Sequence, residues 1–433
     1  LGTDLWPWQL DILRGVTEHQ DDAFTHRWGL FSTARQNGKT KLIAALIGWW
    51  ITSGRIARGG PQQVLSVAHK LDTAEQIAYE LFPVLETVFG FDCWQSSGRM
   101  VARHDDGSIW RIQSATPKAG HGTTNDLLVV DELFDVHEVV LNSGLLPTQR
   151  SRPNPLAVFC STAGTEDSTA FRRWRERGIK IVETGVPDRL FFAEWSPPPN
   201  VDPSDRRYWH MANPALGCGF LTMQDIEDEW RSPDRDAFIR SSLNMWTAAQ
   251  LSWIPHGIWE TLLVTEPMPD GGFLAVDSDL AENGYSAVRA VTRPDGLIQV
   301  RHEFTVDRLT ELWPAIDAVS PTTRPTIALT PGLAQVAPSQ LAEKAVTVGR
   351  VEMQRFTQLV RNTILERQLI HGGQVMFSEH VARAVPVTAS GALTLSSSRS
   401  PGPIELARCM VWAVGLALKP VRTGKPEFGR ARS

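Results

Sequence analysis

Short apolar runs that alternate with helical stretches mark the first half of the chain. Four runs of strand length cover residues 28–33, 64–68, 127–130 and 157–160. Continuous apolar runs of this kind are typical of strands buried on both faces, and their alternation with helical stretches favours parallel strands. The pattern predicts a parallel sheet flanked by helices.

Two breaks in the pattern follow this sheet. Residues 196–203 contain four prolines and predict a loop that leaves the sheet. Residues 225–246 carry acidic residues early and apolar residues at helical spacing, so we expect them to be helical. The second break, at 254–272, contains three prolines and a pair of glycines. It predicts a boundary between two domains.

The second half of the chain has its own strand-like and helical runs. The strand-like runs are at 273–276, 287–291, 298–304 and 327–330, and the helical runs are near 339–348 and 355–367. These elements predict a second α/β domain. We therefore expect a first domain over 1–255 with a helical subdomain at about 204–250, a linker over 256–270, a second domain over 271–420 and a basic flexible tail over 421–433.

Length and composition are consistent with this organisation. A chain of 433 residues is long enough for two or three domains of roughly 100–200 residues. Hydrophobic residues make up 42% and charged residues 21%, which is typical of a soluble globular protein, and no apolar run approaches the roughly 20 residues of a membrane span. The four cysteines lack CxxC spacing, which argues against a zinc site or a disulfide framework and favours a reducing cytoplasm. The chain begins at Leu1 without a secretory-signal pattern, so we expect the natural N-terminus to extend further.

Charge gives little indication of a partner. The net charge of −5 shows no overall basic excess, so any contact with nucleic acid must be local. Five basic residues and one acidic residue lie between positions 419 and 432, and we interpret this segment as a solvated tail.

The segment 32–40 has the features of a variant P-loop between a strand and a helix. Gly38 allows the backbone to approach a phosphate, Lys39 places a positive charge at the β- and γ-phosphates of ATP, and the Thr40 hydroxyl can join an Mg²⁺ shell. Thr33 stands where the usual motif has its first glycine. The alternative is a helix start with a lysine that reaches solvent. The remaining candidate ATP contacts in the loop are Arg35, Gln36 and Asn37.

The apolar run at 127–130 ends in two adjacent carboxylates, which is a Walker B pattern. Ligands bind at the carboxyl ends of such strands, so Asp131 is placed to hold Mg²⁺. Glu132 can then orient or deprotonate the water that attacks the γ-phosphate. A strand that ends in a solvated acidic turn is the alternative, but the order of the two motifs and their separation of about 90 residues favour an ATP site.

Two further segments are candidates for the same site. Gln9 lies among tryptophans and can pair with both a donor and an acceptor on an adenine edge, although core packing is an equally simple explanation. Ser161 and Thr162 end the strand-like run at 157–160, where a turn could sense the γ-phosphate.

These four segments, in this order and spacing, resemble the large terminase subunit of tailed bacteriophages, which packages DNA into capsids. In that family they are the adenine motif, the deviant Walker A, the Walker B with its catalytic glutamate and the coupling motif. The resemblance implies that Glu132 is the general base and that Thr162 lies in the coupling turn. It leaves the arginine finger open among Arg35 in cis and Arg150 or Arg152 in trans, and each of these could equally be a surface residue.

The resemblance covers essentially the full sequence, and it implies a second domain that is a nuclease of ribonuclease H-like fold. Asp277 ends the apolar run at 273–276 and is the candidate bridging ligand for two Mg²⁺ or Mn²⁺ ions. Glu405 opens a late helix where the family usually has aspartate. The middle acid is missing, because Thr330 stands where the family usually has aspartate. Asp279 or Glu303 could contribute instead, and Asp277 could also be an ordinary residue at a strand end.

The expected function is therefore ATP-driven translocation of double-stranded viral DNA into a procapsid, with metal-dependent cutting of concatemeric DNA. The resemblance implies the small terminase subunit and the portal protein as partners, a ring of five copies on the portal, and the cytoplasm of an infected bacterial host as the location. A P-loop helicase is the main alternative, and it should carry a second P-loop-like sheet. The second alternative is a capsid or portal-associated protein with a vestigial nucleotide site.

Overall fold

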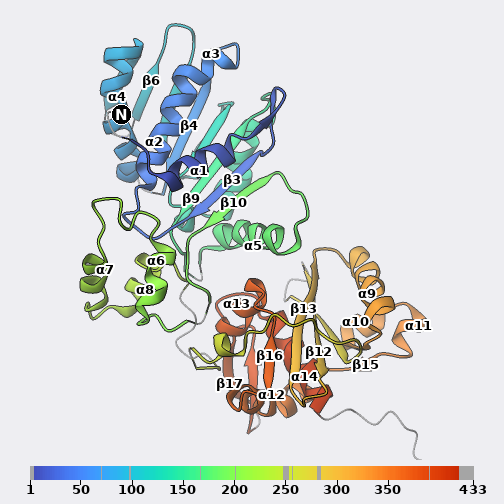
Figure 1. Cartoon of the computed structure of the whole chain (residues 1–433). Helices are drawn as coiled ribbons and strands as arrows, with labels where there is room; N and C mark the ends of the chain where they lie inside the picture. Colours follow the sequence, from blue (N-terminus) through green and yellow to red (C-terminus); the bar gives the residue numbers. More distant parts are fainter. Residues whose placement is uncertain are drawn as a thin grey trace, which may run out of the picture. The chain divides into compact units, whose positions relative to one another are not determined.

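The computed structural model describes residues 4–418 apart from 70, 97–98, 166, 200, 247–252, 256, 280–283 and 390. Contacts between Cα atoms divide the chain into two compact units, 1–198 with 203–247 and 199–202 with 248–433. Each unit is built around a sheet (Figure 1). The predicted linker at 256–270 falls within the second unit of this division, and the predicted tail at 421–433 lies outside the described residues.

The described residues of the first unit form an eight-stranded sheet with the order β10-β3-β9-β8-β4-β7-β6-β5. The predicted parallel strands are present, and β10 adds a further parallel strand at one edge. At the other edge the sheet is mixed, because β5–β6 and β6–β7 pair antiparallel. The strands are β3 (Trp28–Ser32), β4 (Gln63–Ala68), β5 (Asp92–Ser96), β6 (Arg99–Arg103), β7 (Ile109–Ser114), β8 (Leu127–Val130), β9 (Leu156–Ser161) and β10 (Leu190–Glu194).

Helices cover both faces of this sheet because its central strands bury side chains alternately on each side. Along β8, Leu127 and Val129 belong to one core, and Leu128 and Val130 belong to the other. The first core packs against α1 (Pro7–Val16), α2 (Lys39–Trp49) and α4 (Leu71–Phe89), with η1 (Trp50–Gly54) and α3 (Arg55–Ala57) extending α2. The second packs against α5 (Thr169–Thr184) and the short turns η2 (Leu133–Asp135), η3 (Val140–Leu145) and η4 (Leu146–Gln149). A small hairpin pairs β1 (His19–Gln20) with β2 (Ala23–Phe24).

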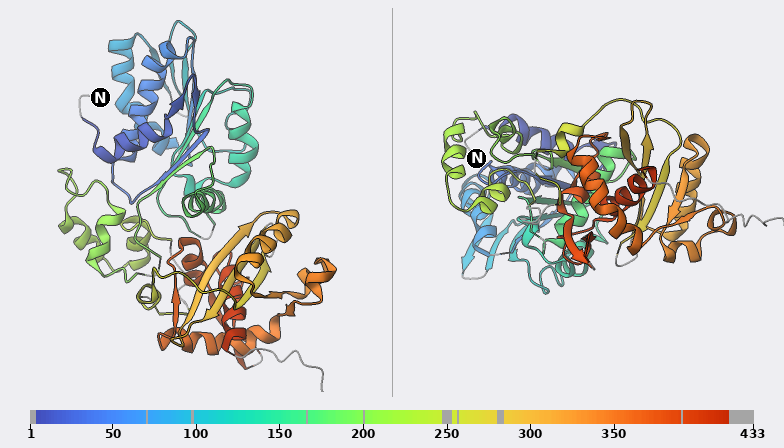
Figure 2. Two further views of the ribbon diagram at one scale, coloured as in Figure 1. Left: turned by 45° about the vertical axis from the view of Figure 1, so that its right-hand side comes forward. Right: turned by 90° about the horizontal axis from the view of Figure 1, so that it is seen from below.

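A group of short helices follows the sheet, and we call residues 205–246 the helical segment. It contains η5 (Arg206–Tyr208), α6 (Trp209–Ala212), α7 (Met223–Trp230) and α8 (Arg235–Ser241) around a small core, and the views in Figures 1 and 2 show it as a separate cluster beside the sheet. The helical character predicted for 225–246 is present as two helices, because Pro233 breaks the run and Asp234 caps α8 by accepting from the Ala237 amide.

The described residues of the second unit form a six-stranded sheet with the order β15-β14-β11-β12-β13-β16. β12 is antiparallel to both β11 and β13, whereas the other pairs are parallel, which is the mixed arrangement expected of a ribonuclease H-like domain. The strands are β11 (Phe273–Ser278), β12 (Tyr285–Thr292), β13 (Ile298–Val306), β14 (Thr326–Leu329), β15 (Val346–Thr347) and β16 (Leu369–His371).

Six helices and a hairpin complete the described part of the second unit. They are α9 (Leu309–Thr323), α10 (Pro331–Val336), α11 (Ser339–Ala342), α12 (Arg350–Leu365), α13 (Val375–Arg383) and α14 (Glu405–Leu418), with the hairpin of β17 (Val385–Ala389) and β18 (Ala392–Ser396). The helix predicted at 339–348 was wrong beyond Ala342, because the β-branched pair Val346–Thr347 extends the sheet beside β14.

Two tryptophans, Trp253 and Trp259, pack the segment before the second sheet against the second unit. In η6 (Trp259–Leu262), the Trp259 ring stacks on His371 with centroids 4.1 Å apart, and its indole donates to Ser378 Oγ at 3.0 Å. The Trp253 indole donates to the Val381 carbonyl at 3.0 Å. The proline-rich break is therefore packed against the second unit where it is described. Across the described residues, no helix combines the length and apolar character needed to cross a membrane.

Close packing of α14 on α12 gives a test of the second unit. A Cβ on Gly415 would lie 2.2 Å from Phe356 Cγ, whereas a Cβ on Gly332 in α10 would meet no atom within 4 Å. We expect Gly415→Ala to lower the free energy of unfolding by about 1–3 kcal/mol through overpacking, and Gly332→Ala to leave it unchanged or slightly raised. Urea unfolding followed by circular dichroism measures both. Equal midpoints for Gly415→Ala and the wild type would contradict this packing.

Candidate functional site

The loop between β3 and α2 has a conformation that depends on glycine at one position. Gln36 and Gly38 both adopt left-handed backbone conformations, with φ of 56° and 85°. A Cβ on Gly38 would lie 2.5 Å from a Trp6 ring atom and 2.9 Å from Gln9 Nε2. Only glycine satisfies both the backbone angle and the available space here. The loop therefore leads into α2 with its backbone closely packed, as a phosphate-binding loop requires.

Lys39 is the first residue of α2, and its ammonium is held inside the loop. Its Nζ donates to the carbonyls of Thr33 and Ala34 at 3.0 and 2.8 Å and to Thr162 Oγ1 at 2.9 Å. Burial lowers the pKa of Lys39 to about 8, and the nearby acidic groups, Asp131 among them, partly offset this effect. The ammonium is thus still charged near neutral pH and points to the end of the sheet where β3 and β9 meet.

Asp131 and Glu132 follow β8 at the same end of the sheet. Asp131 is buried, and its Oδ1 accepts hydrogen bonds from the Cys160 thiol and the Glu132 amide, both at 2.8 Å. Burial raises the pKa of both carboxyls, and for Glu132 the neighbouring Asp131 raises it further. Glu132 has φ of 52°, a left-handed conformation that costs roughly 1–2 kcal/mol for a residue with a side chain. Such strain often marks a functional position.

The coupling-turn candidates lie between these two groups. Ser161 Oγ accepts from the Phe134 amide at 3.1 Å and donates to the Thr162 carbonyl at 2.9 Å, while Thr162 contacts Lys39. The structure therefore brings the loop lysine, the Walker B acids and the turn after β9 together. The oxygens of this group suit Mg²⁺, and the Lys39 ammonium suits the phosphates of a nucleoside triphosphate. Thr40, half-buried in the first turn of α2, lies at the same end of the sheet.

Gln9 occupies a position between the N-terminal segment and the loop. Its Oε1 accepts from the Trp6 amide and its Nε2 donates to the Gly38 carbonyl, each at 2.9 Å. Trp8 packs edge-on against Trp195 in the core. Trp6 instead stacks on Phe220 of the helical segment, with centroids 4.8 Å apart and an interplanar angle of 13°. The aromatic residues next to the loop are thus Trp6 and Phe220, and the latter was not predicted.

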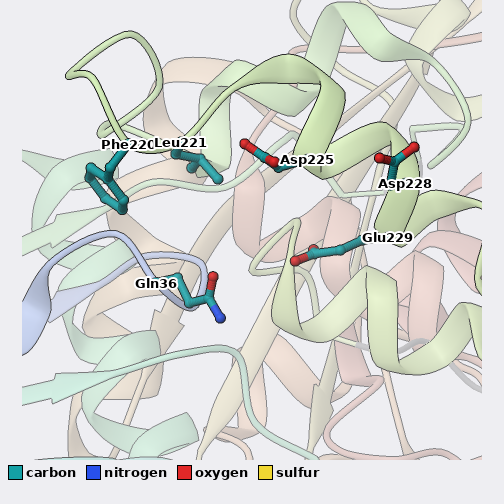
Figure 3. Close-up of a pocket in the computed structure, with 6 residues that line it drawn as sticks. All are labelled: Gln36, Phe220, Leu221, Asp225, Asp228 and Glu229. Carbon is teal, nitrogen blue, oxygen red and sulfur yellow. The ribbon is translucent and has the colours of Figure 1, made fainter.

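A cavity of about 460 Å³ lies beside the loop. Figure 3 shows Gln36 on one side of it and Phe220, Leu221 and three acidic residues of the helical segment around it. Each acid already has a partner: Asp225 accepts from Thr222, Asp228 from Gln224 and Arg231, and Glu229 from Ser242. Acidic walls disfavour phosphate, so this cavity is a poorer candidate for phosphate binding than the loop.

Asn213 of the helical segment contacts the predicted loop residue Asn37, and sequence reasoning missed Asn213. Asn37 Nδ2 donates to Asn213 Oδ1 at 2.9 Å, and the Ala215 amide donates to Asn37 Oδ1 at 3.0 Å. Both asparagines are buried. Cys160 was also missed as a donor to Asp131. No local signal identifies these residues, because their partners are far away in the sequence.

The three arginine candidates are in different places. Arg35 is exposed in the loop, where its charge lowers the pKa of Glu132 against the larger effect of burial. Arg152 donates to Thr124 Oγ1 at 2.9 Å and lies 3.8 Å from Asp126, just before β8 begins. Arg150 is exposed nearby in the chain. Arg152 is therefore at the opposite end of β8 from Asp131. Of the three candidates, Arg35 is the one that lies at the same end of the sheet as Asp131.

The second unit brings Asp277 and Glu405 together with an arginine. Both carboxyls are buried, and Arg408 Nε forms an ion pair with Asp277 Oδ2 at 3.2 Å. Burial is the main cause that raises the pKa of Asp277 to about 6 and that of Glu405 to about 7, and each is then affected by the nearby charges. His380 accepts from the Leu406 amide at 3.2 Å at the start of α14.

The third acid of this site remains absent among the described residues. β14 pairs with β11 so that Leu329 lies beside Val276, which puts Thr330 next to Asp277. The Glu303 carboxylate forms an ion pair with the buried Arg289, with Oε1 and Nε 2.6 Å apart. Asp279 follows β11 with its amide bonded to the Gly284 carbonyl at 3.1 Å. Within the described residues, no three His, Cys, Asp or Glu side chains gather in one place, so Asp277 and Glu405 supply fewer carboxylates than a complete two-ion site uses.

Comparison with known proteins finds a similar fold over both units. The large terminase subunit of Enterobacteria phage HK97 is 25% identical over 272 residues, which are 59% of this chain and 50% of that protein. The crystal structure of the HK97 large terminase covers 96% of this chain and 95% of that chain at 20% identity, with a TM-score of 0.51. The predicted resemblance to large terminase subunits is confirmed. The fold class predicted with it is confirmed as well.

Other comparisons add less. The sequence match spans about half the length of the HK97 relative. The ATPase domain of the large terminase of Thermus phage P74-26 aligns over 57% of this chain and 96% of that chain at 17% identity, with a TM-score of 0.40, which is too low to carry a conclusion. No family model matches the chain.

Because burial lowers the pKa of Lys39, its ammonium should lower the free energy of unfolding by an amount that depends on pH. Its folded pKa of about 8 lies below the usual 10.5, so between these values the unfolded state binds more protons and stability rises with pH. We expect Lys39→Met to be more stable than the wild type at pH 7, by about 1–3 kcal/mol, and the difference to narrow between pH 8 and 10. Calorimetric or urea unfolding at several pH values measures this.

Lys41 offers the matched control, because its ammonium bonds the Asp4 carbonyl at the exposed surface. We expect Lys41→Met to show no comparable change with pH. A Lys39→Met protein that is less stable than the wild type at pH 7, with no narrowing at higher pH, would contradict a net cost of burying the ammonium.

Proposed function

We propose that this chain is the ATP-driven motor that moves double-stranded viral DNA into a procapsid. The observation that supports it most directly is the meeting of Lys39, Asp131, Glu132 and Thr162 at the carboxyl ends of β3, β8 and β9. The similarity to large terminase subunits supports the same function. The proposal takes ATP and Mg²⁺ as the ligands of this site.

Each residue has a role that follows from its surroundings. The Lys39 ammonium faces the β- and γ-phosphates, and Gly38 with the start of α2 presents backbone amides to them. Thr40 and Asp131 would hold Mg²⁺, which would neutralise charge that develops on the phosphates. The Glu132 carboxylate accepts the proton of the attacking water, and its raised pKa, caused mainly by burial, makes it a stronger base. Arg35 is the cis candidate for stabilising transition-state charge.

The helicase alternative is less consistent with the second unit. A helicase should repeat a parallel P-loop-like sheet, whereas β12 here is antiparallel to both neighbours. A vestigial nucleotide site is also disfavoured, because the Lys39 ammonium and the buried Asp131 carboxylate both have polar partners. We infer double-stranded DNA, the small terminase subunit and the portal protein as partners, a ring of five copies on the portal, and the cytoplasm of an infected bacterium as the place of action.

The motor proposal is tested by two variants with different expected defects. Lys39→Ala removes the charge that faces the phosphates and should weaken ATP binding, whereas Glu132→Gln should keep binding and lower turnover by about 100-fold or more. Calorimetric titration with ATP and a phosphate-release assay separate the two effects. Lys41→Ala, two positions further along α2, is the control and should retain both activities. Unchanged turnover in Glu132→Gln would remove that residue as the base.

For the second unit we propose a DNA-cutting site that is short of one carboxylate. Asp277 and Glu405 supply two acidic groups at β11 and α14, and Thr330 stands beside Asp277 where a third would be expected. Mn²⁺ should support cutting better than Mg²⁺, because it tolerates an incomplete and less regular oxygen site. Asp279 is the further residue that could contribute.

Plasmid cleavage in each metal tests this second proposal. We expect weak wild-type cleavage, no cleavage by Asp277→Ala, and stronger cleavage by Thr330→Asp, because the added carboxylate restores a ligand to the site. Thr326→Asp, at the exposed start of the same strand, adds the same charge away from the site and should change nothing. Strong Mg²⁺-dependent cleavage that survives Asp277→Ala would place the site elsewhere.

A further inference from the structure

Asn244 lies where three neighbouring strands of the first sheet end. Its Oδ1 accepts from the Ala163 amide at 2.6 Å, and its Nδ2 donates to the Trp195 carbonyl at 2.9 Å. Ser32 Oγ lies 3.1 Å from Oδ1 and 2.9 Å from Nδ2. Ser32 ends β3, Ala163 follows β9 and Trp195 follows β10. One buried side chain of the helical segment therefore joins the ends of β10, β3 and β9.

The same segment also bonds the backbone of the P-loop. The Ala212 carbonyl accepts from Thr33 Oγ1 at 3.0 Å and from the Ala34 amide at 3.2 Å. The Ser241 carbonyl accepts from the Arg35 amide at 2.7 Å. These bonds involve two helices of the helical segment, since Ala212 ends α6 and Ser241 ends α8. A change in the loop conformation would therefore displace the ends of both α6 and α8.

Asn244 is connected to Lys39 through the turn after β9. Thr162 Oγ1 accepts from Lys39 Nζ, and the next residue, Ala163, is held through its amide by Asn244. A phosphate at the loop competes with Thr162 for the same ammonium. If Thr162 then moves, the adjoining peptide unit moves with it, and the hydrogen bond from the Ala163 amide to Asn244 changes.

We propose that Asn244 is a positioning residue that transmits the nucleotide state of the P-loop to the helical segment. The proposal rests on the motor function proposed above and deepens it, because it names the side chain through which the ATP site and the helical segment act on each other. The requirement for asparagine is specific. The position needs a donor and an acceptor on one side chain, and its φ of 50° is one that asparagine tolerates better than most residues.

Glycine is the cleanest deletion of this side chain, because it accepts the left-handed backbone without strain. Asn244→Asp is the second variant: it keeps an acceptor for the Ala163 amide but loses the donor to the Trp195 carbonyl. Asn154→Gly is the matched control. Asn154 has φ of 48°, and its side chain accepts from the Phe24 amide and donates to the Asp22 carbonyl, just before β9 begins and so at the opposite end of the sheet.

The experiment measures hydrogen exchange of residues 205–246 in the full chain with and without a non-hydrolysable ATP analogue, together with ATP turnover in the presence of DNA. We expect the wild type and Asn154→Gly to show an analogue-dependent change in exchange, and Asn244→Gly to lose most of it. In Asn244→Gly the DNA-stimulated kcat should fall about tenfold while the KM for ATP changes less than about threefold, and Asn244→Asp should lie between.

The outcomes separate transmission from structural support. If Asn244→Gly keeps the exchange difference, or if the wild type shows none although it binds the analogue, the inference is wrong. Loss of analogue binding in Asn244→Gly would equally overturn it, because Asn244 would then only support the P-loop. A wild type that neither binds nor hydrolyses ATP would instead reject the motor function itself, whatever the Asn244 variants do.

Discussion

The parallel register of β3, β9 and β8 determines which side chains meet at the candidate nucleotide site. Ser32 pairs with Ser161, and Val130 pairs with Phe159, so the three strands deliver their following loops to one edge. A shift of one residue would turn each side chain to the other face of the sheet. The thiol of Cys160 would then no longer reach Asp131. The chemistry of the site is thus fixed by backbone pairing before any ligand is considered.

Burying charge at this edge has a cost that the surrounding groups offset. A lysine ammonium removed from water is tolerated only if it is well paired, and Lys39 has three oxygen partners as well as nearby acids. The helical segment contributes in a second way, because its carbonyls accept hydrogen bonds from the loop amides of Ala34 and Arg35 and its Asn213 and Ala215 pair with the buried Asn37 side chain. The segment is therefore part of the site rather than an attachment to it.

The sequence predicted the central strands well because buried parallel strands have an unbroken apolar pattern, as at 127–130. It missed β5–β7, whose partly exposed residues are less apolar; β7 pairs parallel with β4, whereas β6 pairs antiparallel with both β5 and β7. It also missed the contacts that complete the site. Asn37 and Asn213 are 176 residues apart, and Ser32 and Asn244 are 212 residues apart, so neither pair leaves a local pattern. Such contacts depend on tertiary packing and cannot be found from spacing in one sequence.

The second unit balances its strand-end charge in a different way. In the first unit a lysine on a helix faces the acids of a neighbouring strand, whereas in the second an arginine on the same helix as Glu405 lies against Asp277. This guanidinium does not fully compensate burial, because desolvation still raises the pKa of Asp277 to about 6. A third carboxylate beside Asp277 would add negative charge without a further cation and would raise that pKa more. With Thr330 uncharged, two buried acids face two arginines, because Arg408 acts on both Asp277 and Glu405 and Arg383 also acts on Glu405. A carboxylate at position 330 becomes favourable only when a divalent ion adds the missing positive charge.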